Sequence, residues 1–305
     1  MKKLALLFLL LFSAISFSQL SNKHWIPPLH SRDNSAISDQ YIYMSTNETV
    51  PFQVIATDGN GTPYAGSPFT ISASTPAFFT IGTGQPTKMF LSLSDVNTVV
   101  SGKGVLLQGP KDFYVSFRMR HASHAETIIS KGKPGIGTSF RLGCTINEIQ
   151  DNRKNFVASV MATENNTSVT LSNYNTGVIF SSGTGNITAD TQNYILNAGQ
   201  CIVFSGYSNV TANLTGIIGG LITADKPVAV NTGNALGGIT NGRADLTLDQ
   251  IVSATQIGTD YIFIQGNGIS TMENPLIVAN ENGTDIYING SATQITTINA
   301  DQYYL

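Results

Sequence analysis

The sequence predicts an all-β protein, built from tandem β-sandwich or jelly-roll-like modules of about 110 residues each. From residue 50 onward, short apolar runs alternate with turn residues, and no window of about 11 residues shows helical spacing. Charged residues make up only 11% of the chain, against about 25% in an average soluble domain. Abundant Gly, Ser, Thr and Asn complete a composition that is typical of extracellular β-proteins. A recurring segment sets the module length.

The recurring segment occurs in three copies, at residues 54–62, 160–167 and 277–284. Each copy has an apolar run, a turn of acidic, amide or glycine residues, and a Thr that begins a second run. This pattern predicts two strands joined by a tight turn. Counted from Ala56 through Ala162 to Ala279, the copies lie 106 and 117 residues apart. A repeat of this length corresponds to one small β-module.

The likeness between the second and third copies extends downstream, because residues 196–203 align with residues 298–305. The third copy therefore stops inside a module. A β-sheet that is cut between strands has an edge of unpaired backbone groups. We therefore expect the natural polypeptide to continue beyond Leu305.

The amino terminus has the pattern of a secretory signal peptide over residues 1–18. Lys2 and Lys3 precede an apolar run, and Ser18 supplies a small residue of the kind that signal peptidase reads, so cleavage is expected between Ser18 and Gln19. The alternative is an uncleaved anchor. No later stretch approaches about 20 consecutive apolar residues. The sequence therefore predicts a secreted or cell-surface protein with no transmembrane segment after the signal peptide.

The mature chain divides into four parts by its periodicity. Residues 19–49 have little periodicity and predict an extended lead-in, with one strand candidate at residues 40–45. Residues 50–150 are expected to form module 1 and residues 151–265 module 2. Residues 266–305 begin a truncated module 3.

Seven short runs in the second module suit a sandwich better than a single four-stranded propeller blade; they span residues 156–162, 168–171, 178–181, 193–196, 201–205, 216–223 and 227–231. A β-propeller with two blades per repeat is the alternative. Pro227 is expected at the start of the last strand, where its missing N–H is tolerated. A linker strand is expected after the module at residues 261–265.

Several of these segments resemble the amino-terminal region of IgGFc-binding protein, a domain also present in large secreted proteins of gliding bacteria. The resemblance depends on Ala-Thr-Glu-Asn-Asn-Thr at residues 162–167, on Leu-Asn-Ala-Gly-Gln at 196–200 and on Ala-Asp-Lys-Pro-Val-Ala-Val at 224–230. It covers roughly residues 50–305 and implies a binding or adhesion role at a cell surface. Residues 24–29 are also similar to the start of bacterial members that carry a gliding-motility-associated or secretion-sorting carboxyl-terminal tail, which is absent from residues 1–305. Immunoglobulin binding is not implied, because no residue set matches an Fc contact.

Two polar features suggest metal or phosphate chemistry only weakly. His121 and His124 are three residues apart after a strand-like run, where such side chains point to opposite faces, so a polar loop is favoured over a metal site. Residues 132–138 are glycine-rich but lack the Gly-Lys-Ser/Thr ending of a phosphate loop. They predict a hairpin connection between the strands on either side.

The acidic residues of the recurring segment are assigned to turns. Asp58, Glu164 and Glu281 each precede a turn whose backbone they can stabilise by local hydrogen bonds. Calcium binding by residues 58–62 is the weaker alternative, since Phe69 stands where a calcium loop has its bidentate Glu.

No motif of a nucleophile elbow, a zinc protease or a Cys-x-x-Cys pair is present in the sequence. We therefore assign no catalytic, cofactor-binding or metal-binding residue and predict that the protein is not an enzyme. Cys144 and Cys201 either form a disulfide in an oxidising compartment or remain unpaired buried thiols. The net charge of −3 gives no reason to expect nucleic acid as a partner.

The expected function is non-catalytic binding or adhesion within a larger surface protein, with an extracellular glycan, a mucin or a cell-surface protein as partner. Tyrosines that stack on sugar rings or pack into the core are Tyr174, Tyr194, Tyr207, Tyr303 and Tyr304. The first alternative is a structural stalk of serial modules. The least favoured is an extracellular glycan-active hydrolase, which needs a pair of carboxylates in a cleft.

Overall fold

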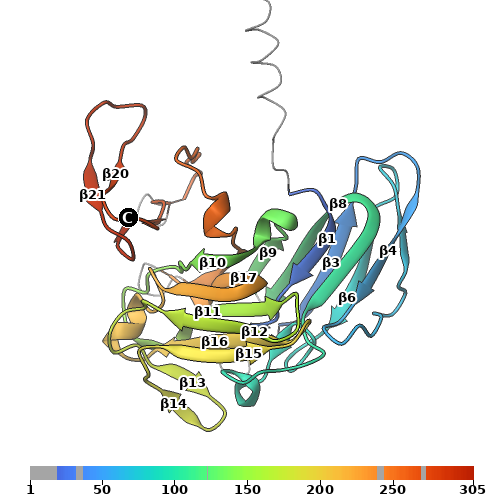
Figure 1. Cartoon of the computed structure of the whole chain (residues 1–305), viewed down its shortest axis with the longest axis horizontal. Helices are drawn as coiled ribbons and strands as arrows, with labels where there is room; N and C mark the ends of the chain where they lie inside the picture. The colour runs from blue at the N-terminus through green and yellow to red at the C-terminus, as the bar shows by residue number, and fades with distance from the viewer. Residues whose placement is uncertain (1–18, 32–36, 122, 239–243, 269–272) are drawn as a thin grey trace, which may run out of the picture.

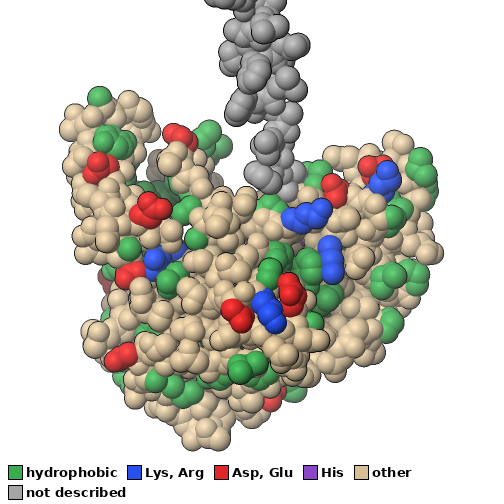
Figure 2. Space-filling model, viewed as in Figure 1, with side chains coloured by type: hydrophobic (Ala, Val, Ile, Leu, Met, Phe, Trp, Pro, Cys, Tyr) green, Lys and Arg blue, Asp and Glu red, His purple; other side chains and the backbone are tan. Residues whose placement is uncertain are grey.

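The computed structural model describes residues 19–31, 37–121, 123–238, 244–268 and 273–305. The predicted all-β class is confirmed, and the described ranges contain no α-helix. Two seven-stranded sheets lie side by side, and the last residues form a smaller unit with a projecting hairpin (Figure 1). The face in Figure 2 is mostly uncharged. Short 3₁₀ turns are Leu93–Asp95 (η2), Lys133–Gly135 (η3), Thr211–Leu214 (η4) and Ala254–Gln256 (η5).

The first sheet, here called module 1, folds around one long strand. Its strands are β1 (Ser21–Ile26), β3 (Asp39–Ser45), β4 (Phe52–Thr57), β5 (Phe69–Ile71), β6 (Ala77–Gly82), β8 (Val105–His121) and β9 (His124–Ile129). The first half of β8 pairs with β1 and β4, and its second half pairs with β3 and β9. Module 1 is therefore a sandwich of two layers, β1–β8–β4–β5 and β9–β8–β3–β6, that share β8.

Alternation along the strands fills the space between the layers. In β3, Ile42 and Met44 are buried, whereas Tyr41 and Tyr43 lie on the outer face, as the period of two requires. Val54 of the opposite layer belongs to the same hydrophobic core. A short parallel pair, β2 (Leu29–His30) with β7 (Phe90–Leu91), adds further buried side chains to it.

The second sheet, module 2, has the same plan. Its strands are β10 (Ile136–Arg141), β11 (Asp151–Ala162), β12 (Thr167–Ser172), β15 (Gln192–Leu196), β16 (Cys201–Ser208), β17 (Leu221–Gly237) and β18 (Asp245–Gln250). A separate hairpin joins β13 (Phe180–Ser182) to β14 (Gly185–Ile187). The long strand β17 pairs with β10 and β12 in one layer and with β11 and β18 in the other.

Both modules have the same strand order. The path β5-β4-β8-β3-β6 in module 1 matches β15-β12-β17-β11-β16 in module 2, and the first and last strands of each module pair with the long strand. Because each sheet is organised around a strand shared by two layers, the arrangement is that of sandwiches and not of separate four-stranded propeller blades.

Each long strand contains a proline where it passes from one layer to the other. Residues 109–112 of β8 and 224–227 of β17 form bulges in which four residues face a single residue of the first strand. Pro110 and Pro227 lie in these bulges, where the ladder needs no N–H. The prediction that Pro227 starts a strand was wrong, because β17 is continuous through it.

A threonine that directly follows β3 in module 1 and β11 in module 2 marks the equivalent position in the two modules. Thr46 Oγ1 donates a hydrogen bond to Asp112 O at 2.9 Å, and Thr163 Oγ1 donates one to Pro227 O at 2.6 Å. Both acceptors belong to a bulge of the long strand. The connection from β3 to β4 is therefore the counterpart of the connection from β11 to β12.

Because of this equivalence, the residues of module 1 that correspond to module 2 are not those that the similar segments indicate. Residues 54–62 join β4 to β5, whereas residues 160–167 join β11 to β12, so the first of the three similar segments occupies a different place in the fold. The matching positions are Ser45, Ala162 and Ala279, which are evenly spaced by 117 residues.

The module boundaries also differ from the expected ones. Strands β1 and β3 come from residues 19–49, so this segment is part of module 1 and not an extended lead-in. The glycine-rich residues 132–138 do not close a hairpin, because β9 pairs with β8 and β10 pairs with β17. Module 1 therefore ends near residue 129, and module 2 covers residues 136–250.

The chain enters and leaves both modules at one place, here called the junction, which comprises His24, Ser130, Gly132, Gln250 and Ser253. The His24 Nδ1 atom lies 2.9 Å from Ser130 Oγ, which donates to Gln250 Oε1 at 3.0 Å. The Ser253 N–H donates to Pro134 O at 3.2 Å. The first strand and the last strand of each module therefore meet at the middle of the long strand.

Beyond the junction, the two modules share backbone contacts. Val100 and Cys201 exchange a pair of backbone hydrogen bonds, both at 2.9 Å. Gly59 and Gly199 approach so closely that a Cβ on Gly199 would lie 1.9 Å from Gly59 O. Because Val157 also joins the core of module 1, the two modules are packed as one body.

The last residues form a smaller third unit. In it, β19 (Ile277–Val278) pairs with β22 (Tyr303–Tyr304), and β20 (Thr284–Ile286) pairs with β21 (Thr296–Ile298). The guanidinium of Arg141 in β10 donates to the Asp301 carboxylate and thereby ties the unit to module 2. Residues 261–265 have no strand structure, so the predicted linker strand was wrong.

Candidate functional site

The two cysteines are unpaired in the structure. Cys144 Sγ lies 3.7 Å from Thr215 O, whereas Cys201 Sγ lies 3.6 Å from Gly199 O. Both thiols are buried, and burial raises the pKa of Cys144 to about 12 and also raises that of Cys201. Of the two alternatives that the sequence leaves open, the structure therefore has buried thiols and not a Cys144–Cys201 disulfide. Of the expected cleavage site, Ser18 lies outside the described residues, and Gln19 is exposed.

The histidine pair lies in a β-hairpin. His121 and His124 face each other across β8 and β9, and His124 Nδ1 lies 3.2 Å from Asp245 Oδ1 of module 2. Within the described ranges, no three His, Cys, Asp or Glu side chains gather as metal ligands would. His124 therefore contributes to the contact between the modules.

The turn role that the sequence predicts for Asp58 is confirmed. Its buried carboxylate accepts hydrogen bonds from the N–H groups of Asn60 at 2.9 Å and Thr62 at 3.1 Å. Lys88 Nζ lies 2.6 Å from the other oxygen. Although burial opposes ionisation, these donors together hold the pKa of Asp58 below its usual value.

Most of the tyrosines considered as sugar-stacking residues pack inward. Tyr174 lies 4.9 Å from Phe180, and Tyr194 lies 5.8 Å from Phe204, both measured between ring centroids. Tyr207 packs edge-on against His30. Tyr304 packs against the small core of the third unit, and Tyr303 is 37% exposed.

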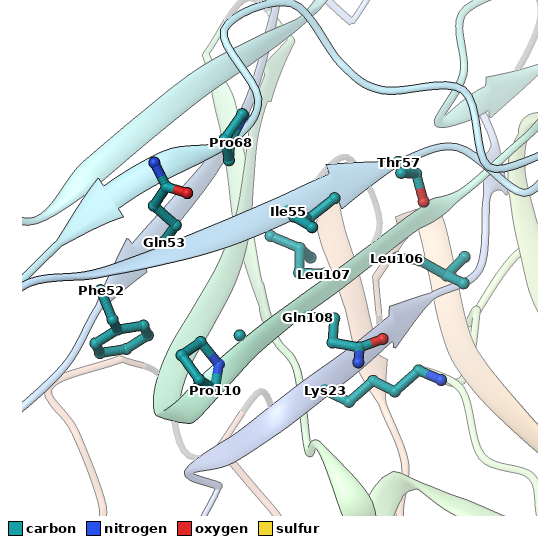
Figure 3. Close-up of a pocket in the computed structure, with 11 residues that line it drawn as sticks. Lys23, Phe52, Gln53, Ile55, Thr57, Pro68, Leu106, Leu107, Gln108 and Pro110 are labelled. Carbon is teal, nitrogen blue, oxygen red and sulfur yellow. The ribbon is translucent and has the colours of Figure 1, made fainter.

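An open groove crosses the outer face of the layer β1–β8–β4 (Figure 3). Its volume is about 840 Å³. Cross-strand pairing places Lys23, Gln108 and Ile55 in one row. Mostly apolar side chains line this groove, together with two glutamine amides, Thr57 and Lys23, and no carboxylate is among its lining residues. The groove therefore offers no pair of carboxylates of the kind that glycoside hydrolysis needs.

The opposite layer of module 1 carries an aromatic patch, defined here as Tyr41, Tyr43, Phe78 and Arg118. Tyr43 and Phe78 are cross-strand partners on β3 and β6, and their rings stack with centroids 5.4 Å apart and planes inclined by 21°. The guanidinium carbon of Arg118 lies 4.2 Å from the Tyr43 ring centroid. The Tyr41 ring centroid lies 6.2 Å from that of Tyr43 and 6.3 Å from that of Phe78.

This aromatic patch is rigid and open to solvent. Its side chains come from three hydrogen-bonded strands, β6, β3 and β8, and Phe78 is 59% exposed. An ion pair of 2.6 Å between Arg120 and Asp39 borders the patch. Exposed aromatic rings beside an arginine are the side chains that most often dominate protein interfaces, and aromatic faces also stack on sugars.

The aromatic patch could be found only in part from the sequence. Alternation within residues 40–45 places Tyr41 and Tyr43 on one face. Phe78 and Arg118 come from distant positions, and only strand pairing brings them to the tyrosines.

Comparisons with known proteins agree with the resemblance seen in the sequence. Residues 125–305 match the family described as IgGFc binding protein. Neither a curated protein nor a solved structure matches the chain. The matched residues run from β9 through module 2 to the end of the third unit.

One further observation concerns membranes. In the part of the chain that the structure describes, no helix has the length and apolarity needed to cross a bilayer.

The match to the family extends over more than half of the chain, and its residues form the all-β module and third unit described above. The chain belongs to the IgGFc binding protein family.

Proposed function

We propose that this chain is a non-catalytic binding and adhesion module of a secreted or cell-surface protein. Its family supports a binding role, and its low content of charged residues, 11%, is typical of extracellular β-proteins. The equal strand order and the spacing of 117 residues support an origin of the modules as tandem copies of one unit. Binding by an array gains strength from multivalency, so a single module needs only modest affinity.

The observation that carries this proposal is the aromatic patch. Phe78 stacks on Tyr43 at the solvent face, although burial would be the ordinary place for a phenylalanine. Arg118 over the same ring supplies hydrogen-bond donors beside the apolar surface. The partner that this chemistry fits is an extracellular glycan, a mucin or a glycosylated cell-surface protein.

The test compares two exposed apolar residues on opposite layers of module 1. Phe78→Ser removes a ring of the aromatic patch, whereas Ile55→Ser removes a side chain of similar exposure, 54% against 59%, from the groove. Binding of the full chain to a glycan array and to immobilised mucin is measured for both variants. We expect Phe78→Ser to weaken binding at least about tenfold, as loss of a hot-spot aromatic does, and Ile55→Ser to leave it unchanged.

Two results would contradict this assignment. If only Ile55→Ser reduces binding, the groove and not the aromatic patch holds the ligand. If the wild-type chain binds none of the glycans or mucins, and deletion of the protein leaves cell adhesion unchanged, the adhesion role itself is wrong.

A further inference from the structure

The third unit reproduces two of the strand pairs of module 2, β11 with β16 and β12 with β15. Ile277 pairs with Tyr304 in the register that Val160 has with Ile202. Thr284 pairs with Ile298 in the register that Thr167 has with Leu196. Strands β19 and β22 are therefore equivalent to β11 and β16, and β20 and β21 are equivalent to β12 and β15.

The turns that connect these strands are also the same. Asn165 Oδ1 accepts a hydrogen bond from Ala198 N at 3.0 Å, and Asn282 Oδ1 accepts one from Ala300 N at 3.1 Å. In both units, a glutamine oxygen accepts the N–H of the residue three positions earlier at 2.8 Å. The third unit therefore has the local structure of a module whose two layers have begun to form.

In module 2, one strand joins these two pairs. The long strand β17 lies between β12 and β11 and hydrogen-bonds to both. Within residues 273–305, β19 pairs only with β22, and β20 pairs only with β21. The edges of β19 and β20 that correspond to the β17 side consequently have no strand ladder.

Residues 257–264 form a third unpaired segment, which has no strand structure in this chain. Ile-Gly-Thr at residues 257–259 repeats Ile-Gly-Thr at 136–138, the start of β10, and β10 also pairs with β17. The counterpart of buried Phe140 is then Tyr261, which is 62% exposed, and that of buried Leu142 is Phe263, which is 63% exposed. Ten of the sixteen exposed large hydrophobic residues in the described ranges lie in residues 257–305.

We propose that the third unit binds one long polypeptide strand with the pattern of β17, which pairs with β19 in one layer and with β20 and residues 261–264 in the other. This is strand addition to an open sheet edge, in which backbone hydrogen bonds give affinity and alternate side chains fill the core. The two open edges and the unpaired segment at residues 257–264 all correspond to partners of β17, which is why the occupant is a strand and not a glycan.

The occupant is an extended segment outside residues 1–305. Both long strands of this chain, β8 and β17, already pair with four strands of their own module. A folded second copy therefore has no long strand to donate. The β17 pattern gives the required chemistry, with inward apolar residues at Ile222, Val228 and Val230 and a proline in the bulge.

The test uses a synthetic peptide with the sequence of β17, Leu221–Gly237, added to the full chain. Hydrogen exchange is followed at residues 257–265 and 274–288. We expect exchange there to slow at least tenfold with the peptide, because its backbone pairs with the open edges. A control peptide with Asp in place of Ile222, Val228 and Val230 should give no protection.

A matched pair of chain variants makes the test specific. Ile277→Asp places a charge on β19 and should abolish the protection, whereas Ile195→Asp alters a 69% exposed side chain on β15 and should leave it intact. If the free peptide gives no protection, the same sequence is joined after Leu305 by a flexible linker, which raises its effective concentration to about the millimolar range.

Absence of protection in the fused chain would overturn the proposal. Protection that develops without any peptide and rises with protein concentration would also overturn it, since the edges would then pair with a second copy. Equal protection by the control peptide would show that nonspecific apolar contact, and not strand pairing, covers these residues.

Discussion

Acid should destabilise this protein through His24. The imidazole is fully buried, with Nε2 3.0 Å from both Ser21 O and Phe113 O. Desolvation by burial lowers the pKa of His24 from 6.5 to about 4, and the two carbonyl contacts oppose this only in part. The perturbation is a change of pH from 7.5 to 4.5, compared between the wild type and His24→Gln, a variant that cannot titrate there.

The sign follows from the direction of this shift. Below pH 6.5 the unfolded chain takes up a proton on His24 before the folded protein does, so the stabilisation is complete above pH 6.5 and is lost as the pH falls towards 4. Each unit of pKa difference corresponds to about 1.4 kcal/mol, which gives a loss of about 2.5 kcal/mol by pH 4.5.

Trp25, the one tryptophan of the chain, lies beside His24 in β1, so its fluorescence reports the unfolding of module 1. Denaturant titrations at pH 7.5, 5.5 and 4.5 measure the free energy of unfolding for both proteins. His30, whose pKa burial also lowers, contributes equally to both and cancels in the difference. Parallel pH profiles for wild type and variant would refute the assignment of the acid sensitivity to His24.

Two further predictions concern buried packing. Gly199→Ala should lower the unfolding free energy by roughly 2 kcal/mol or more, because Gly199 has φ +77° and its Cβ would meet Gly59 O. The control Gly61→Ala, with φ +79° and open space around it, should cost only about 1–2 kcal/mol. Equal losses of unfolding free energy in thermal denaturation would count against a tight contact at Gly199. Native protein without reductant should not react with a thiol reagent and should show two reactive thiols after denaturation; fewer than two would mean that the cysteines pair.

The fold class could be predicted from the sequence, but the alignment of module 1 with module 2 could not. Alternation in residues 40–45 correctly predicted β3, because Ile42 and Met44 are apolar and face the core. The first strand was missed since one of its buried positions is His24, whose burial depends on oxygen atoms of distant residues. The turn at Asp58 resembles the turn at Glu164, since any tight reversal favours the same residue types, although the two join different strands.

The aromatic patch shows the same division between local and non-local information. A period of two indicates which face of β3 carries Tyr41 and Tyr43. The register of β3 with β6 and β8 decides that Phe78 and Arg118 lie beside them. Short β patterns leave that register open, because a shift by two residues keeps every apolar side chain inside.

The junction has a mechanical consequence. Because both ends of each module meet there, a pull along the chain loads the short path through Ser130 and Gln250, not the length of the sheets. Hydrogen bonds of the junction carry the tension, and the strands at the far edges of the sheets, such as β5 and β15, lie off the line of force. Tension along the chain therefore leaves the outer faces of both modules folded.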